Sequence, residues 1–184
     1  YVDEAGSTVV LNVAAASVVV REPRITLTSA FAVANADAAD ILTVSVTATN
    51  TGTAAAYDLQ VLDDLTGKKL TFLGNLGGAD PPNTVDTTTL GANRPIFSWN
   101  PANPRFALAP GASIGFTYQV RVDDDVQPQE ILDHALQASW KSLPNQSTAL
   151  NGAGVIGADG AVTGRRIGAL PNAGNAINDY ETTA

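Results

Sequence analysis

Few side chains in this sequence are of the types that carry out chemistry. The only histidine, His134, alternates with the apolar residues Leu132, Leu136 and Ala138. A Ser-His-Asp hydrolase needs such an imidazole as its base, and a zinc site here would have to combine it with carboxylates. Because residues two apart in a strand share a face, we expect His134 to lie partly buried with a hydrogen-bond partner. The sequence therefore predicts no catalytic residue and no enzyme.

A run of three acids, Asp123-Asp124-Asp125, offers a candidate metal site. The run follows a predicted strand and lies in a predicted turn. Carboxylate oxygens are the ligands that Ca²⁺ prefers, and Asp63-Asp64 offers the same chemistry. Neither spacing is that of an EF-hand, and acids in a turn are commonly just solvated. Asp123, Asp124 and Asp125 are thus candidate calcium ligands, and the sequence predicts no other cofactor.

A covalent cross-link between a lysine and an asparagine is a further option, because such a bond would staple a sandwich mechanically. The only lysines are Lys68, Lys69 and Lys141. The first two occupy a predicted turn, where a solvated amine is expected. Lys141 follows Trp140 at the end of a predicted strand, where its side chain could point inward. The sequence indicates no acid and asparagine partner for any of them.

Composition narrows the class of protein. Ten Lys and Arg against eighteen Asp and Glu give a formal charge of −8, which repels nucleic acid and anionic lipid. The chain has no cysteine and no methionine, so a core rather than disulfides must hold the fold. No apolar run reaches the ~20 residues of a membrane span, so we expect no membrane insertion in this segment. The absence of cysteine also suits large exported repeat proteins.

Residues 41–65 show the period of two strands. Apolar residues alternate with serine and threonine from Leu42 to Thr49, which is typical of a half-buried strand. In Asn50-Thr51-Gly52-Thr53, asparagine and glycine favour the positive φ of a tight reversal. A second strand follows. Its inward parity holds Tyr57, Leu59, Val61 and Asp63. The sequence predicts a hairpin that reverses at residues 50–53.

The rest of the chain is predicted to form further short strands and no full helix. Strands are predicted over residues 24–29, 70–73, 95–99, 106–108, 112–122, 131–140 and 177–184. Pro110-Gly111 marks a turn, one helical turn is expected at residues 128–132, and residues 74–93 and 144–176 form long surface loops. The aromatics are expected in the core: Phe97, Trp99, Phe116, Tyr118 and Trp140. Seven to nine strands indicate an all-β, immunoglobulin-like antiparallel β-sandwich.

The first 23 residues are interpreted as a leading β segment and linker, and residues 24–184 as the sandwich. Two β-prone pieces within residues 7–20 precede Pro23, which cannot donate to a sheet. Residues 1–5 and 180–184 share a tyrosine, an acid and an alanine in similar spacing. The leading segment is therefore predicted to be the tail of a preceding repeat or a strand donated to a neighbour.

Several motifs carry a resemblance to a known family. In chain order they are Asn50-Thr51-Gly52-Thr53, Asp63-Asp64-Leu65, Leu108-Ala109-Pro110-Gly111-Ala112-Ser113, Ala138-Ser139-Trp140-Lys141-Ser142-Leu143-Pro144 and Asn178-Asp179-Tyr180. Together they resemble the conserved-repeat domains, known as domain of unknown function eleven, of large bacterial cell-surface, fimbrial and adhesin proteins. Thr66 stands where that family usually has proline. The resemblance implies the same immunoglobulin-like fold.

The resemblance also implies a function. We expect a non-catalytic structural repeat of a bacterial extracellular or cell-surface protein, a spacer or filament subunit in adhesion, matrix or appendage assembly. Its partners would be neighbouring copies, in one form of the hypothesis through addition of residues 7–20 as a strand to another copy's sheet. The alternative is a ligand-binding module that holds carbohydrate or a host protein with loops 74–93 and 144–176.

Overall fold

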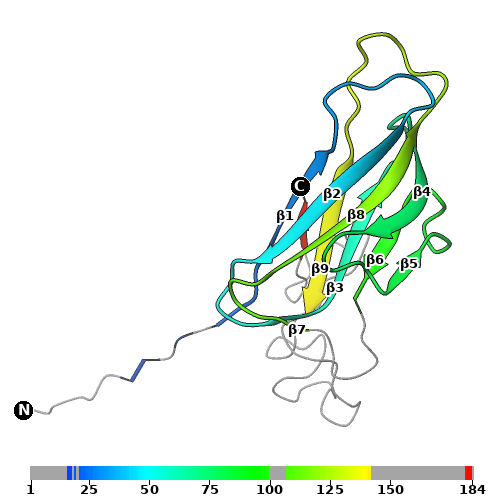
Figure 1. The fold of residues 1–184 in the computed structure, drawn as a ribbon. Helices are drawn as coiled ribbons and strands as arrows, with labels where there is room; N and C mark the ends of the chain where they lie inside the picture. The colour runs from blue at the N-terminus through cyan, green and yellow to red at the C-terminus, as the bar shows by residue number, and fades with distance from the viewer. Residues whose placement is uncertain (1–15, 18, 20, 100–106, 142–180, 184) are drawn as a thin grey trace, which may run out of the picture.

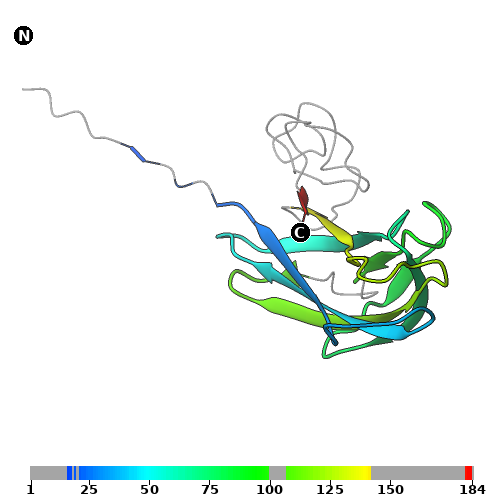
Figure 2. The same cartoon turned by 90° about the horizontal axis from the view of Figure 1, so that it is seen from above.

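Two antiparallel sheets face each other in the structure, a computed structural model that describes residues 16–17, 19, 21–99, 107–141 and 181–183. Figure 2 shows the two layers from above. The predicted loop 144–176 and most of the leading segment lie outside the described residues. Within the described residues there are ten strands and no helix, so the predicted all-β, immunoglobulin-like sandwich is confirmed. No helix long and apolar enough to cross a membrane occurs in this part of the chain.

The strands divide between the sheets as Figure 1 shows. The first sheet has the order β1 (Ile25–Phe31), β2 (Ile41–Asn50), β8 (Ser113–Val122), β4 (Leu70–Gly77). The second has the order β10 (Glu181–Thr183), β9 (Ala135–Lys141), β3 (Ala56–Asp64), β6 (Ile96–Ser98), β5 (Thr84–Asp86), with β7 (Ala107–Leu108) beside β3. The long strands β2, β3, β8 and β9 form the centre of the sandwich.

The core forms where the alternating strands meet face to face. In β8 every second side chain from Ile114 to Val122 is buried, and β2 buries every second side chain from Leu42 to Ala48. This is the parity predicted from the sequence. The five aromatics predicted for the core are also buried, and their exposed fractions do not exceed 4%. Packed rings of this kind contribute both apolar area and edge-to-face contacts.

The predicted hairpin at residues 50–53 is wrong. β2 pairs with β1 and β8 in the first sheet, whereas β3 pairs with β6, β7 and β9 in the second. The chain therefore crosses from one sheet to the other at Asn50-Thr51-Gly52-Thr53. Neither Asn50 nor Gly52 has a positive φ, so the two residues do not serve the turn chemistry that the sequence suggested. Instead, the Asn50 side chain forms hydrogen bonds with distant backbone groups, and Gly52 allows two backbone segments to approach closely.

Two smaller expectations also need correction. Residues 74–93 are not all loop, because β4 continues to Gly77 and β5 lies within them. The helical turn expected at residues 128–132 is instead a reversal in which the Glu130 amide donates to the Gln127 carbonyl at 3.0 Å. Gln129 has a φ of 66°, which interrupts any helix. The strand predicted from residue 131 accordingly begins at Ala135.

Candidate functional site

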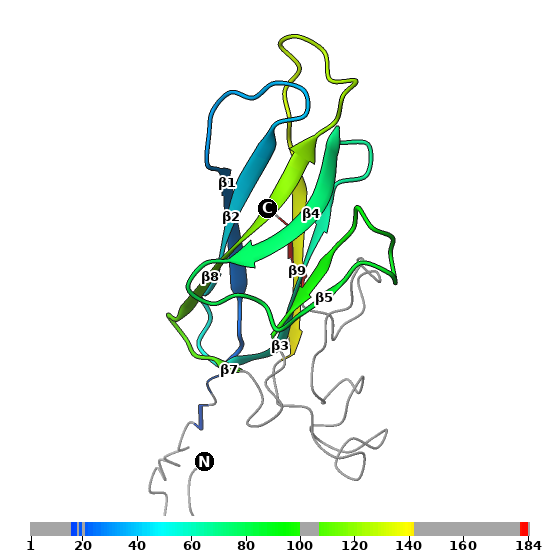
Figure 3. The same cartoon turned by 45° about the vertical axis from the view of Figure 1, so that its right-hand side comes forward.

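The sandwich has two ends that differ in structure. We call the lower end the one where β1 begins, beside the connections 51–55 and 109–112; Figure 3 shows residues 21–24 arriving there. The upper end is where β1 stops, beside the loops 32–40 and 123–134 (Figure 1). The candidate functional features lie at these two ends, and the apolar core separates them.

Asn50 organises the lower end with its side-chain amide. Its Oδ1 accepts hydrogen bonds from the backbone amides of Arg24 at 3.2 Å and Gly52 at 3.0 Å. Its Nδ2 donates to the carbonyls of Ala54 and Leu108, both at 2.8 Å. The residue is fully buried. One amide therefore satisfies four backbone groups. They belong to the connection between the sheets, to the end of β7 and to residues 21–24, the segment that leads into β1, which we call the incoming chain.

The backbone of Asn50 joins a further turn to the same point. Its amide donates to the Ala112 carbonyl at 3.0 Å, and its carbonyl accepts from the Gly111 amide at 2.8 Å. Between them the Ala112 amide donates to the Ala109 carbonyl at 3.0 Å, and Gly111 has a φ of 78°. Proline followed by a positive-φ glycine is the pattern of a type II turn. The predicted Pro110-Gly111 turn is confirmed, and its place beside Asn50 is new.

Gly52 lets the incoming chain lie directly against the connection between the sheets. The Thr51 amide donates to the Arg24 carbonyl at 2.7 Å, and the Thr53 amide donates to the Glu22 carbonyl at 2.8 Å. A Cβ atom on Gly52 would lie 2.4 Å from both the Arg24 nitrogen and the Glu22 oxygen. Backbone atoms cannot yield as a flexible side chain can. The glycine is therefore required by close approach of two backbones.

A buried polar network lies toward the upper end. The Tyr118 hydroxyl donates to Oδ2 of Asp63, and Nδ1 of His134 lies 3.2 Å from both carboxylate oxygens. The Asp63 side chain is fully buried and that of His134 is 7% exposed. Burial, together with the neighbouring Asp63 carboxylate, raises the pKa of Tyr118 well above its usual value. The Phe31 ring packs against the imidazole with centroids 5.2 Å apart.

This network fits a structural role for His134, as the sequence suggested. The recorded partners of the imidazole are Asp63, Tyr118 and Phe31, and none of them is a serine or threonine. An Asp-His pair needs a reachable nucleophile for acyl transfer, whereas the Tyr118 side chain is fully buried. The three groups satisfy one another and tie β3, β8 and the segment before β9 together.

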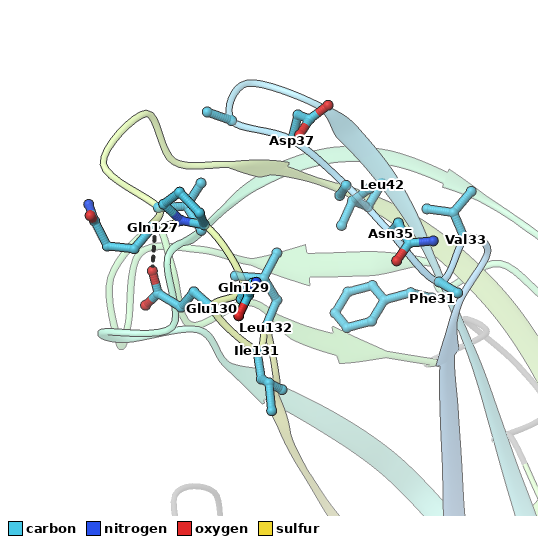
Figure 4. Close-up of a pocket in the computed structure, with 15 residues that line it drawn as sticks. Phe31, Val33, Asn35, Asp37, Leu42, Gln127, Gln129, Glu130, Ile131 and Leu132 are labelled. Atoms are coloured by element: carbon cyan, nitrogen blue, oxygen red, sulfur yellow. Dashed lines mark hydrogen bonds between the residues drawn. The ribbon is translucent and has the colours of Figure 1, made fainter.

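An open pocket of about 660 Å³ lies at the upper end, between residues 31–38 and residues 126–132. Its lining includes the apolar residues Phe31, Val33, Ile131 and Leu132, of which Figure 4 shows Phe31 and Leu132 facing each other. Val33 is 52% exposed and Ile131 is 88% exposed. This pocket was not predicted from the sequence. The available signal was the occurrence of large aliphatic residues in two otherwise polar loops.

Polar groups complete the pocket wall. The Glu130 carboxylate accepts a hydrogen bond from the Gln127 amide at 2.8 Å (Figure 4). Asp37 lies on the opposite loop, and its amide donates to the Asp40 carboxylate at 2.8 Å. The side chains of both Asp37 and Glu130 are exposed. The pocket thus presents an apolar surface with acidic groups on two sides.

The three candidate calcium ligands have three different partners. Asp123 accepts a hydrogen bond from the Thr71 hydroxyl at 2.7 Å, while Asp124 pairs with Arg121 and Asp125 with Lys69. The hydrogen bond with Lys69 lowers the pKa of Asp125, and the same bond raises the pKa of Lys69. The described residues contain no cluster of three potential metal ligands. The calcium site stays a prediction.

The side chains of Asp63 and Asp64, the other acidic pair, lie in different environments. Asp63 points into the buried network, whereas Asp64 forms an ion pair with Arg94 at 3.0 Å. Burial alone would raise the pKa of Asp64, but hydrogen bonds from Thr66 and the charge of Arg94 outweigh it, so that the pKa is lowered. The two carboxylates therefore do not face a common site.

The lysines considered for a cross-link lie in surface ion pairs where they are described. Lys68 binds Asp133 at 2.9 Å, and Lys69 binds Asp125. Both partners are aspartates on exposed loops. The side chain of Lys141 lies outside the described residues, so the option of a cross-link through Lys141 is not tested.

The loop predicted to bind ligands, residues 74–93, is fastened to the sandwich. The Asp80 amide donates to the Gly115 carbonyl at 2.9 Å, and its carboxylate accepts from the Gly115 amide at 3.2 Å. The Asp80 carbonyl accepts from Nε1 of Trp99 at 2.9 Å. Farther along the loop, the hydroxyls and amides of Thr88 and Thr89 bind Asp86 and lower its pKa. Hydrogen bonds through Asp80 thus hold this largely exposed segment against β8.

Comparison with known proteins gives a weak structural likeness. No family model and no curated protein matches the chain. Among solved structures, the chain is similar to the chitin-binding domain of Chi18aC from Streptomyces coelicolor, with 20% sequence identity and a TM-score of 0.33. The alignment covers 61% of this chain and 90% of that domain. A likeness at this level carries no functional argument.

We predict that Gly52→Ala destabilises the protein by about 2 kcal/mol or more, because the new Cβ must push the incoming backbone away. The matched control is Gly115→Ala, since a Cβ at Gly115 meets nothing within 4 Å and its φ is not positive. The control should change stability by less than about 0.5 kcal/mol. Urea denaturation of the two variants measures the difference, and equal stabilities would contradict the close approach.

We predict that Tyr118 makes the protein sensitive to alkali. Its pKa is raised in the folded state, so the unfolded chain ionises first, near a pH of about 10. The stability contribution is complete below that pH and falls above it by about 1.4 kcal/mol per pH unit. Tyr118→Phe should be less stable at neutral pH by about 1 to 3 kcal/mol, because Asp63 loses a donor.

The measurement is urea denaturation between pH 7 and pH 11. Tyr118→Phe should lose stability less steeply above pH 10 than the unchanged chain, while Tyr57→Phe, a tyrosine that is only half-buried, should keep the original slope. Parallel alkaline curves for the unchanged chain and Tyr118→Phe would rule out this role of the Asp63 network.

Proposed function

We propose that this chain is a non-catalytic structural module of a bacterial extracellular or cell-surface protein, a spacer or filament subunit that transmits tension along its length. The direction of the first and last described strands, β1 and β10, carries the proposal. β1 begins at the lower end, where Ile25 lies opposite Asn50. β10 runs toward the upper end, because Glu181 lies opposite Ser139 and Thr183 opposite Gln137.

This arrangement suits a load applied to the two ends. A pull on β1 and β10 acts along the strands, whereas the hydrogen bonds to β2 and β9 lie across them. All the hydrogen bonds between two paired strands then bear the load at the same time rather than one after another. Residues 22–24 are in addition bonded to Asn50, Thr51 and Thr53, so the load reaches the core at once.

The surface supports use in an array. A formal charge of −8 favours the solubility of a long array and disfavours nucleic acid as a partner. The resemblance to the conserved-repeat family favours neighbouring copies of the same repeat as the partners. Contact between copies through residues 7–20 is what we propose for a filament, and in one form of it these residues add as a strand to another copy's sheet. The role in adhesion, matrix or appendage assembly rests on the same resemblance.

The competing function, binding of carbohydrate or a host protein through loops 74–93 and 144–176, ranks second. The first loop is fastened to β8 through Asp80, and the second lies outside the described residues. The five core aromatics are buried, so they offer no platform for a sugar ring.

We predict that the force needed to unfold the chain depends on the direction of pulling. Attachment through the two chain ends loads the ladders along the strands and should require the higher force. Attachment through cysteines placed at Val19 and Thr51, both exposed at the lower end and enclosing β1 and β2, should peel β1 from β2 bond by bond at a lower force.

Single-molecule force spectroscopy measures both directions, and the absence of native cysteine keeps the attachment specific. The doubly substituted chain pulled through its ends is the matched control and should keep the higher force. Equal, low forces in the two directions would refute a mechanical role.

A further inference from the structure

The upper pocket lies on the line along which β10 runs. β10 pairs with β9 and contacts β1, and it heads toward the upper end (Figures 1 and 2). The pocket is formed by the loop that follows β1 and the loop that precedes β9. A chain segment that follows the direction of β10 would thus reach the pocket at the end of the molecule.

The exposed apolar surface of the pocket needs a complementary partner. Val33 and Ile131 are 52% and 88% exposed, and Phe31 and Leu132 line the pocket with them. Such a patch beside acidic groups fits an apolar segment that carries positive charge next to it. Asp37 and Glu130 supply the negative charge here.

The lower end of the same chain has this composition. Residues 7–20 contain no charged residue and are rich in valine. Arg21, Glu22 and Arg24 follow them, and of these three only the arginines are exposed. Val19 is 80% exposed. We propose that the upper pocket binds the leading segment of a second copy of this chain, with Val19 in the apolar part and an arginine beside Asp37 or Glu130.

A copy cannot fill its own pocket in this way. Glu22 is bonded to Thr53 at the lower end, and three residues reach at most about 11 Å from it to Val19. The ten residues of β2 separate the two ends by about 34 Å. Arg21 and Arg24 are held at the lower end for the same reason. The complementary charges can therefore meet only between copies, head to tail.

This inference rests on the proposed use of the chain in an array, and it names the contact between neighbours. Each upper end would hold the segment that leads into the next copy. The contact would fix the angle between successive copies, because the segment is held by Asn50 and Gly52 on one side and by the pocket on the other.

Disulfide trapping between full-length chains tests the contact, since the native chain has no cysteine. Val19→Cys is mixed with Ile131→Cys at about 1 mM, within the effective concentrations that short linkers produce. The control mixture contains Val19→Cys and Leu73→Cys, because Leu73 is 40% exposed on β4. We expect a mixed disulfide dimer with Ile131→Cys and only background with Leu73→Cys.

Charge reversal provides a second readout. Glu130→Lys in the Ile131→Cys chain should lower the yield about threefold, the effect of one surface ion pair, and Arg21→Glu in the partner should restore it. A chain with both Val19→Cys and Ile131→Cys should form multimers, whereas an internally bridged monomer would overturn the proposal. Equal yields with Leu73→Cys, or yields that ignore both charge changes, would also overturn it.

The outcome is separable from the proposed function. A chain that shows no specific trapping but a direction-dependent unfolding force would lose only this contact. A chain that is trapped specifically but unfolds at the same low force in both directions would keep the contact and lose the mechanical role.

Discussion

The side-chain amide of Asn50 is the constraint on which this structure depends. Its four hydrogen bonds reach Arg24, Gly52, Ala54 and Leu108, which belong to segments far apart in the sequence. A buried amide without partners costs free energy, so the bonds form together or the corner opens. Asn50 thereby holds three segments together at one place: the segment that leads into β1, the connection between the sheets and the turn before β8.

The opposite half of the sandwich has its own buried polar group. Asp63 is fully buried and is bonded by Tyr118 from the other sheet and by His134 from the segment before β9. An unsatisfied carboxyl in this position would be far more costly than a hydrocarbon of the same shape. The buried Asn50 amide and the buried Asp63 carboxylate therefore favour one arrangement of the two sheets. The apolar core between these two residues supplies most of the stabilisation.

The strands could be predicted from the sequence because alternation reports directly which side chains are buried. β2 and β8 have the predicted parity, and His134 is bonded and nearly buried as expected. Local pattern does not report which sheet a strand joins, and for this reason the reversal at residues 50–53 was predicted wrongly. Asparagine and glycine serve turns in many chains, but here the amide binds distant backbone and the glycine admits Glu22 and Arg24. The upper pocket depends on two loops meeting in space, which no spacing in the sequence shows.

Residues 22–24, which lead into β1, are bound to the lower end of the sandwich rather than acting as a loose tether. Native-state hydrogen exchange tests this most directly through the backbone amides of Arg24, Thr51 and Thr53, which donate to Asn50, Arg24 and Glu22. We expect these amides to exchange only through global unfolding, with the same free energy as the β2–β8 ladder. Exchange many times faster than that of the ladder, at the rate of an exposed loop, would contradict the account.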